Sequence, residues 1–193
     1  MSILQINSSI HGEDSASTQL SSEIAAELGG TVTLRDLAAA PLPHLDADTF
    51  QAFSATPEAR TPKQAALVAL SDDLIAELRA ADTLVLAVPM YNFGIPSTLK
   101  AWIDHIARAG VSFRYTNNGP EGLLGEKRVI VVATRGGEYA GTEADNQSAY
   151  LQQVLGFLGL GPLEFIYAEG LANPERREEV LTQLRSELPR LAA

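Results

Sequence analysis

The run TLVLAV at residues 83–88 decides the fold class, because every residue after its first threonine is apolar. A strand with one face in water alternates apolar and polar residues, whereas a strand covered on both faces can be apolar throughout. The sequence therefore predicts a sheet with helices on both of its faces. Working outward from this run, five short segments are predicted to be strands: residues 3–7, 31–36, 83–88, 129–134 and 163–168.

Stretches with helical periodicity separate these strands. From residue 64 to 80 the apolar residues recur at helical spacing and form one stripe. A second helix is predicted over 96–109, with Gly110 as its C-terminal cap, and a last helix begins at Asn173-Pro174. This alternation predicts a single α/β domain over residues 1–193, a doubly wound three-layer sandwich with five parallel strands. Such sheets bind ligands at the carboxyl ends of their strands, so we expect the site in the loops after the first, third and fourth strands.

The composition argues against several classes of protein. The chain has 24 Asp and Glu residues against 14 Lys and Arg, a formal net charge of −10, which makes nucleic acid or an anionic membrane surface an unexpected partner. It has no cysteine, which excludes disulfides and thiolate metal sites, and its three histidines are too isolated to form a metal site. The apolar runs are too short for a signal peptide or a membrane span, so we expect a soluble, cytoplasmic protein with no bound metal.

Hydroxyl side chains are dense in the loop after the first strand, which reads NSSIHGEDSASTQL at residues 7–20 and then opens a helix. It contains neither a Gly-x-Gly-x-x-Gly motif nor a Walker lysine, the usual signals for dinucleotides and nucleoside triphosphates. Backbone N–H groups, hydroxyls and the positive end of a helix dipole can still hold a single terminal phosphate. The alternative is that Ser15 or Ser17 only caps the helix.

The loops after the third and fourth strands suit a flat ligand. Residues 90–93 read MYNF, and large flat side chains in a loop favour a tricyclic ring as their partner, although Tyr91 and Phe93 could instead pack against a helix. Residues 134–137 read TRGG, and two glycines at a strand end let backbone N–H groups approach the oxygens of a bound ring. An ordinary turn would also contain these glycines.

The segment PMYNFGIPSTLKAWIDHIARAGVSFRY at residues 89–115 resembles the hallmark segment of the bacterial FMN-dependent NADH azoreductases, a family of flavodoxin-like NAD(P)H quinone oxidoreductases. The hydroxyl loop, the Thr134–Gly137 turn and the segment NGPEGL at 118–123 resemble that family in the same order, so the resemblance covers essentially the whole chain. It implies a flavodoxin-like fold with strand order 2-1-3-4-5, and homodimers with the flavin at the subunit interface.

The resemblance also implies a role for individual residues. The phosphate of a tightly bound FMN would be held by Ser9, Ser15, Ala16 and Ser17. The isoalloxazine ring and ribityl chain would be lined by Met90, Tyr91, Asn92 and Phe93, and the pyrimidine edge of the ring approached by Thr134, Arg135, Gly136 and Gly137. A substrate pocket would involve His11, with Tyr115 and Phe157 reaching toward the pocket of the partner subunit.

The implied activity is the transfer of a hydride from NADH or NADPH to the flavin N5, followed by two-electron reduction of a quinone or azo compound in a ping-pong cycle. No side-chain nucleophile is required. Arg114 and Arg135 could meet an acid group of the acceptor or form surface ion pairs. The alternative function is a flavodoxin-type carrier that passes single electrons between proteins; the long, aromatic segment at 110–127 argues against it.

Overall fold

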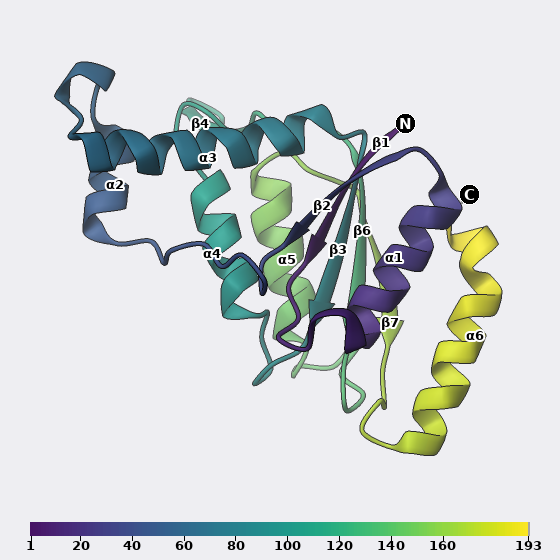
Figure 1. Ribbon diagram of the computed structural model, residues 1–193. Helices are drawn as coiled ribbons and strands as arrows, with labels where there is room; N and C mark the ends of the chain where they lie inside the picture. Colours follow the sequence, from purple (N-terminus) through teal and green to yellow (C-terminus); the bar gives the residue numbers. More distant parts are fainter. Residues whose placement is uncertain (193) are drawn as a thin grey trace.

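A computed structural model describes the backbone of residues 1–192 and the side chains of residues 1–190. Its main feature is a five-stranded parallel sheet of order β2-β1-β3-β6-β7, which confirms the predicted order. All five strands end at the lower edge of the sheet in Figure 1, which places their carboxyl-terminal loops together. The strands are β1 (Ser2–Asn7), β2 (Thr31–Asp36), β3 (Thr83–Pro89), β6 (Arg128–Thr134) and β7 (Leu163–Ala168).

The centre of the sheet is buried as the apolar runs predict. Every residue of β3 is buried, and β6 is buried after its first residue. The edge strand β2 differs, because Thr31 to Leu34 are exposed. The strongest apolar runs therefore mark the strands that have neighbours on both sides.

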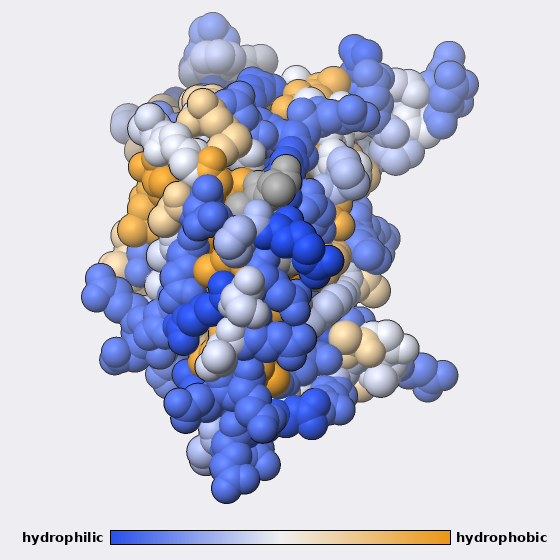
Figure 2. Space-filling view, turned by 90° about the vertical axis from the view of Figure 1, so that its right-hand side faces the viewer, coloured by the Kyte–Doolittle hydropathy of each residue, from blue (hydrophilic) through white to orange (hydrophobic). Residues whose placement is uncertain are grey.

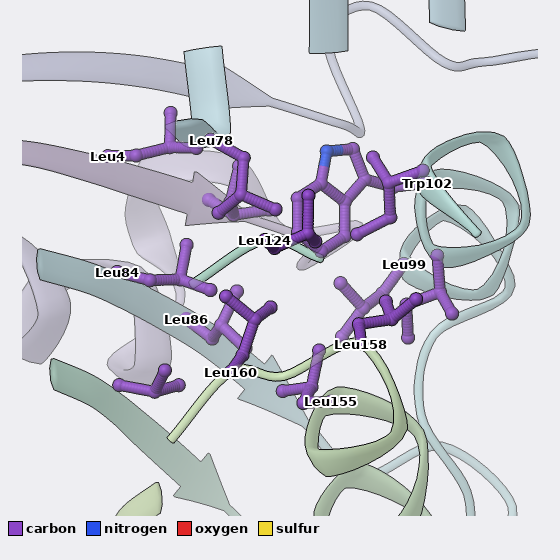
Figure 3. Close-up of a cluster of buried hydrophobic side chains, with 14 of the residues drawn as sticks. Leu4, Leu78, Leu84, Leu86, Leu99, Trp102, Leu124, Leu155, Leu158 and Leu160 are labelled. Carbon is purple, nitrogen blue, oxygen red and sulfur yellow. The ribbon is translucent and has the colours of Figure 1, made fainter. Parts of the chain in front are cut away.

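Helices cover both faces of the sheet (Figure 1). On one face lie α1 (Ala16–Leu28) and α6 (Pro174–Ala192), whose apolar residues pack with Val85, Ile130 and Val132 of the central strands. On the other face lie α3 (Pro62–Ala80), α4 (Ser97–Ile106) and α5 (Asn146–Phe157). Figure 3 shows the core on this second face, where Trp102 of α4 packs among leucines from the strands and helices.

Some elements depart from the prediction. Helix α4 ends at Ile106, three residues earlier than predicted, because the backbone of Ala107 leaves the helical region and the Ser112 hydroxyl accepts the Arg108 N–H. Gly110 is therefore not the helix cap, although it adopts a positive φ of 78° in the turn that follows. An additional helix, α2 (Ala47–Ser54), precedes α3, and an antiparallel hairpin joins β4 (Phe113–Thr116) to β5 (Gly119–Gly122).

The surface on the α1 and α6 side is mostly hydrophilic, with hydrophobic residues confined to small areas between the polar ones (Figure 2). Within residues 1–192, no helix is both long and apolar enough to cross a membrane.

Candidate functional site

A cavity of about 640 Å³ lies at the carboxyl edge of the sheet. Its wall comes from four stretches that are far apart in the sequence: the loops after β1, β3, β6 and β7. The convergence follows from the parallel order of the strands, because each strand delivers its loop to the same edge. The lining residues are Ser9, Ile10, His11, Asp14, Ser15, Ala16, Pro89, Met90, Tyr91, Thr134, Arg135, Gly136, Leu171, Ala172 and Arg177.

The hydroxyl loop leaves the N-terminus of α1 without a side-chain cap. Ser15 is the residue before the helix, but its hydroxyl lies 2.9 Å from that of Ser17 and makes no capping hydrogen bond. Ser15 therefore occupies the N-cap position, as the capping alternative expects, but its side chain does not cap the helix. Within the described residues, the Thr18 hydroxyl on the first turn is also buried with no hydrogen-bond partner. An uncapped helix start beside a cavity has donors available for an anion.

Tyr91 connects the loop after β3 to the hydroxyl loop. Its hydroxyl lies 3.1 Å from Ser9 Oγ and accepts the backbone N–H of Ile10 at 3.2 Å. Ser9 Oγ in turn accepts the N–H of His11. The phenol of Tyr91 therefore lies at the end of the cavity where the serines are. The rest of its loop is the segment that the sequence predicts to contact the flat ring of a ligand.

The residues after Tyr91 form a tight turn. Tyr91 and Gly94 exchange two backbone hydrogen bonds of 3.0 Å, and the two residues between them have positive φ angles, 49° at Asn92 and 64° at Phe93. Asparagine tolerates this region, but a phenylalanine there is uncommon and strained. In this strained turn Phe93 is 55% exposed, and its ring makes an edge-to-face contact with Tyr139 at a centroid distance of 5.7 Å.

A second, smaller cavity of about 250 Å³ shares Met90 and Gly136 with the large one. Its other lining residues are Asn92, Phe93, Gly137 and Tyr139. The two cavities together bring the loop after β3 next to the glycine loop after β6. Ser17 lines neither cavity, because it is fully buried behind Ser15.

The side chain of Arg135 is buried, which corrects the expectation that it forms a surface ion pair or meets an acceptor. Its guanidinium group donates to Asp145 Oδ1 at 2.7 Å and to Glu169 Oε1 at 3.1 Å, and lies over the ring of Tyr167. The side-chain amide oxygen of Gln147 and the hydroxyl of Ser148 also accept hydrogen bonds from it. Each of the three guanidinium nitrogens therefore donates to an acceptor inside the protein. Arg114, by contrast, does form an exposed pair, with Glu121.

The carboxylates around Arg135 fix the glycine loop. Glu169 Oε1 also accepts the backbone N–H groups of Tyr139 and Ala140, so the loop after β6 is tied to the loop after β7. For Asp145, burial alone would raise its pKa, but hydrogen bonds from Ser148 and Arg135 and the charge of Arg135 hold the pKa below its usual value. The ionised carboxylate is thus the stable form in this network.

Two predicted residues lie away from both cavities. Tyr115 is on the β4–β5 hairpin and is 76% exposed, and Phe157 is near the end of α5. Phe113 contacts both of their rings, at 5.7 Å and 4.5 Å. Their expected place in a pocket of a partner subunit stays a prediction.

The sequence reading missed the contribution of the last strand. Leu171, Ala172 and Arg177 follow β7 and line the large cavity, and Tyr139 lines the small one. The rule that locates sites at strand ends applies to β7 as well, so this loop could have been included. Within the described residues, no group of three or more His, Asp or Glu side chains could hold a metal ion.

Comparison with known proteins gives a consistent picture. Residues 1–191 match the family described as having a flavodoxin-like fold. The chain is 51% identical over 189 residues to FMN-dependent NADH:quinone oxidoreductase 6 of Burkholderia lata, an alignment that covers 95% of this chain and 96% of that protein. It is 49% identical over 191 residues to the FMN-dependent NADH:quinone oxidoreductase of Cellvibrio japonicus, with 96% of both chains covered.

Solved structures agree. The crystal structure of azoreductase from Bacillus anthracis str. Sterne superposes with a TM-score of 0.89 at 28% identity, covering 100% of this chain and 98% of that chain. An FMN-dependent NADH-azoreductase from Bacillus anthracis str. Ames Ancestor, solved in complex with FMN, superposes with a TM-score of 0.86 at 24% identity, covering 100% of this chain and 99% of that chain, and shares the fold.

Proposed function

The chain belongs to the flavodoxin-like fold family, and on this premise we propose that it is an FMN-dependent oxidoreductase that takes electrons from NADH or NADPH and reduces quinones and azo compounds. The observation that carries the proposal is the large cavity, which joins an uncapped helix start and serine hydroxyls at one end to an aromatic turn and a glycine loop at the other. The relatives that are named for FMN-dependent NADH:quinone oxidoreduction support it over nearly the full length of the chain.

The serine end of the cavity fits the phosphate of FMN. Ser9 and Ser15 line it with hydroxyl groups, and the start of α1 supplies N–H donors and the positive end of its dipole. Ala16 adds a backbone N–H in the first turn and, with its small side chain, leaves room for the ligand. Ser17 does not reach the cavity itself, but its hydroxyl makes a hydrogen bond to that of Ser15 and orients it.

The other end fits a flat ring. Met90, Asn92 and Phe93 provide one side, and Thr134, Gly136 and Gly137 provide the other. Since Gly136 and Gly137 have no side chain, the main chain there can approach a ring edge closely. Arg135 pairs with Asp145 and Glu169, so the charge of its guanidinium group stays inside the protein. The loop therefore presents backbone N–H groups to the ring.

FMN, when bound, supplies the hydride chemistry that no side chain of the cavity can perform. The residues of the chain bind and orient. Backbone N–H groups of the glycine loop stabilise negative charge at the ring edge, as donors do in an oxyanion site. Phe93 and Tyr139 line the smaller cavity in edge-to-face contact, where their rings would cover part of a bound flavin. Donor and acceptor occupy the same exposed face in turn, which predicts ping-pong kinetics.

The proposal extends to assembly and location. We place the protein in the cytoplasm, as a single domain over residues 1–193 and as a homodimer whose subunits meet around the flavin. The large exposed fraction of Tyr115 supports this assembly, because an aromatic ring on a hairpin is well suited to an interface. Phe157, close to Phe113 on the same side, would join it.

The test is the visible spectrum of the purified protein followed by an assay of NADH oxidation. We expect a yellow protein that releases FMN, and rapid oxidation of NADH when menadione is added without any protein partner. A yellow protein with almost no menadione-dependent oxidation would instead support a flavodoxin-type electron carrier. A protein that takes up no FMN in a titration would overturn both functions.

A further inference from the structure

Arg177 differs from every other lysine and arginine in the described part of the chain. All the other lysine and arginine side chains donate to a carboxylate or to a backbone carbonyl. The side chain of Arg177 makes no hydrogen bond or ion pair within the described residues. In a protein with a net charge of −10, a cation that has neither a carboxylate nor a carbonyl partner is unexpected.

The position of Arg177 explains why it is left unpaired. It lies in the first turn of α6, where its N–H donates to the Asn173 carbonyl at 2.9 Å. The residues three and four positions away along the helix are Asn173, Pro174, Val180 and Leu181, so the helix offers it no carboxylate partner. The adjacent Arg176 points in another direction and pairs with Glu138.

The side chain of Arg177 instead lines the large cavity, together with Ser9 and Ser15. Helix α6 begins at the edge where the strands end (Figure 1), so its first turn faces the same space as the first turn of α1. The residue is partly buried. A partly buried guanidinium group gains most from an anion that neutralises it, and its planar donors match the oxygens of a phosphate.

We propose that Arg177 binds a phosphate group of a ligand in this cavity, and the shared cavity wall with Ser9 and Ser15 favours the terminal phosphate of the flavin. The inference rests on the proposed function. Asp14 lines the same cavity, and its carboxylate repels a phosphate. The positive charge of Arg177 offsets that repulsion. Without it, only the serines and the helix dipole of α1 would attract the phosphate. NADH and NADPH also contain phosphate groups, in the diphosphate of the dinucleotide, and these are the second ligand group that Arg177 could bind.

The test compares Arg177→Gln with Arg176→Gln, a neighbouring arginine with a carboxylate partner of its own outside the cavity. Flavin-free protein is titrated with FMN and with riboflavin, which lacks the phosphate, and binding is followed by quenching of flavin fluorescence. Because a hydrogen bond to a charged group contributes substantially, we expect Arg177→Gln to weaken FMN binding by about tenfold or more. Riboflavin binding stays unchanged, and Arg176→Gln changes neither.

The other outcomes distinguish the two phosphate sources, and they distinguish a failure of the role of Arg177 from a failure of the proposed function. If FMN binding is unchanged but the KM for NADH rises at constant kcat in Arg177→Gln alone, the arginine serves the phosphate of the dinucleotide. If neither quantity changes, or if FMN and riboflavin weaken equally, the inference is overturned. Failure of the parent protein itself to bind FMN would overturn the proposed function instead.

Discussion

Nη1 of Arg135 lies 3.1 Å from Oε1 of Glu169, and that same oxygen accepts the backbone N–H groups of Tyr139 and Ala140. One carboxylate thus joins the end of β6, the end of β7 and the loop that carries Gly136 and Gly137. The backbone reinforces the connection, since Gly170 and Ala172 donate to the carbonyls of Gly137 and Gly136. The loop next to the candidate ring site is therefore held by buried charge.

Removal of this buried charge should destabilise the fold. In Arg135→Ala, Asp145 and Glu169 lose the cation between them, and we expect the free energy of unfolding to fall by about 3–5 kcal/mol. The matched control is Arg114→Ala, whose exposed pair with Glu121 is expected to contribute less than about 1 kcal/mol. Urea denaturation measures both. Equal losses in the two variants would contradict the role of burial.

The same network predicts how stability depends on pH. The pKa of Asp145 in the folded protein lies below its ordinary value of 3.8. The ionised carboxylate therefore makes its full contribution to the free energy of unfolding above pH 3.8, and this contribution is lost as the pH falls through the lower pKa of the folded protein. Asp145→Asn removes this contribution. We expect the parent to be more stable than the variant at neutral pH, with the difference narrowing below pH 3.8. Glu58→Gln, at an exposed site without an ion pair in the described residues, should show a small difference that does not narrow in this way.

Substitutions in the turn between Tyr91 and Gly94 should affect the free energy of unfolding and FMN binding in different ways. Phe93→Gly relieves the positive φ and creates an Asn-Gly turn, so we expect the free energy of unfolding to stay the same or to rise by up to about 1 kcal/mol. FMN binding should weaken, because the exposed ring is lost. Phe93→Ala removes the ring but keeps the strain, and should be less stable than the glycine variant. Denaturation curves that coincide for the two variants would show that no strain is stored there.

A methyl group at residue 137 should act through Tyr139. The Cβ of Gly137→Ala would lie 2.8 Å from the Tyr139 hydroxyl oxygen, so the ring must move and lose its contact with Phe93. We expect weaker FMN binding with a change of less than about 1 kcal/mol in the free energy of unfolding, because the end of the tyrosine can shift. Equilibrium titration with FMN and urea denaturation measure the two effects.

Two further variants test whether Gly137→Ala weakens FMN binding through Tyr139. Gly156→Ala places a methyl group on α5 with no atom within 4 Å beyond its own stretch of helix, and should leave FMN binding unchanged. Gly137→Ala combined with Tyr139→Ala should recover part of the lost binding, because the displaced ring is gone. If the double variant binds as poorly as Gly137→Ala alone, the methyl group acts on the ligand directly.

The strands and the three main site loops were predictable because their signals are local. An apolar run such as residues 83–88 reports burial on both faces, and parallel strand order then brings the following loops together. The same reasoning located Ser9, Tyr91 and Gly136 at one edge, and the structure places all three in the wall of the large cavity. The assignment of a role to each of them came from the family resemblance and remains a proposal.

What was missed depends on contacts between distant residues. Arg135 meets Glu169 across 34 positions of sequence, so its burial has no local pattern. Strand β5 reads GPEG, which no propensity favours as a strand, and it forms because it pairs with Phe113–Thr116. Arg177 could be recognised as unpaired only when the partners of every other basic residue were known.

The open position of β2 at the edge of the sheet sets a condition on how the protein can be handled. Val32 and Leu34 are exposed on a strand that has one neighbour, β1, and such an edge can template the pairing of separate molecules. At neutral pH the surplus of carboxylates keeps molecules apart by mutual repulsion. That repulsion disappears near the isoelectric point of about 4.7. Mild acid should therefore precipitate the folded protein well before it unfolds, and purification is best kept away from acetate buffers.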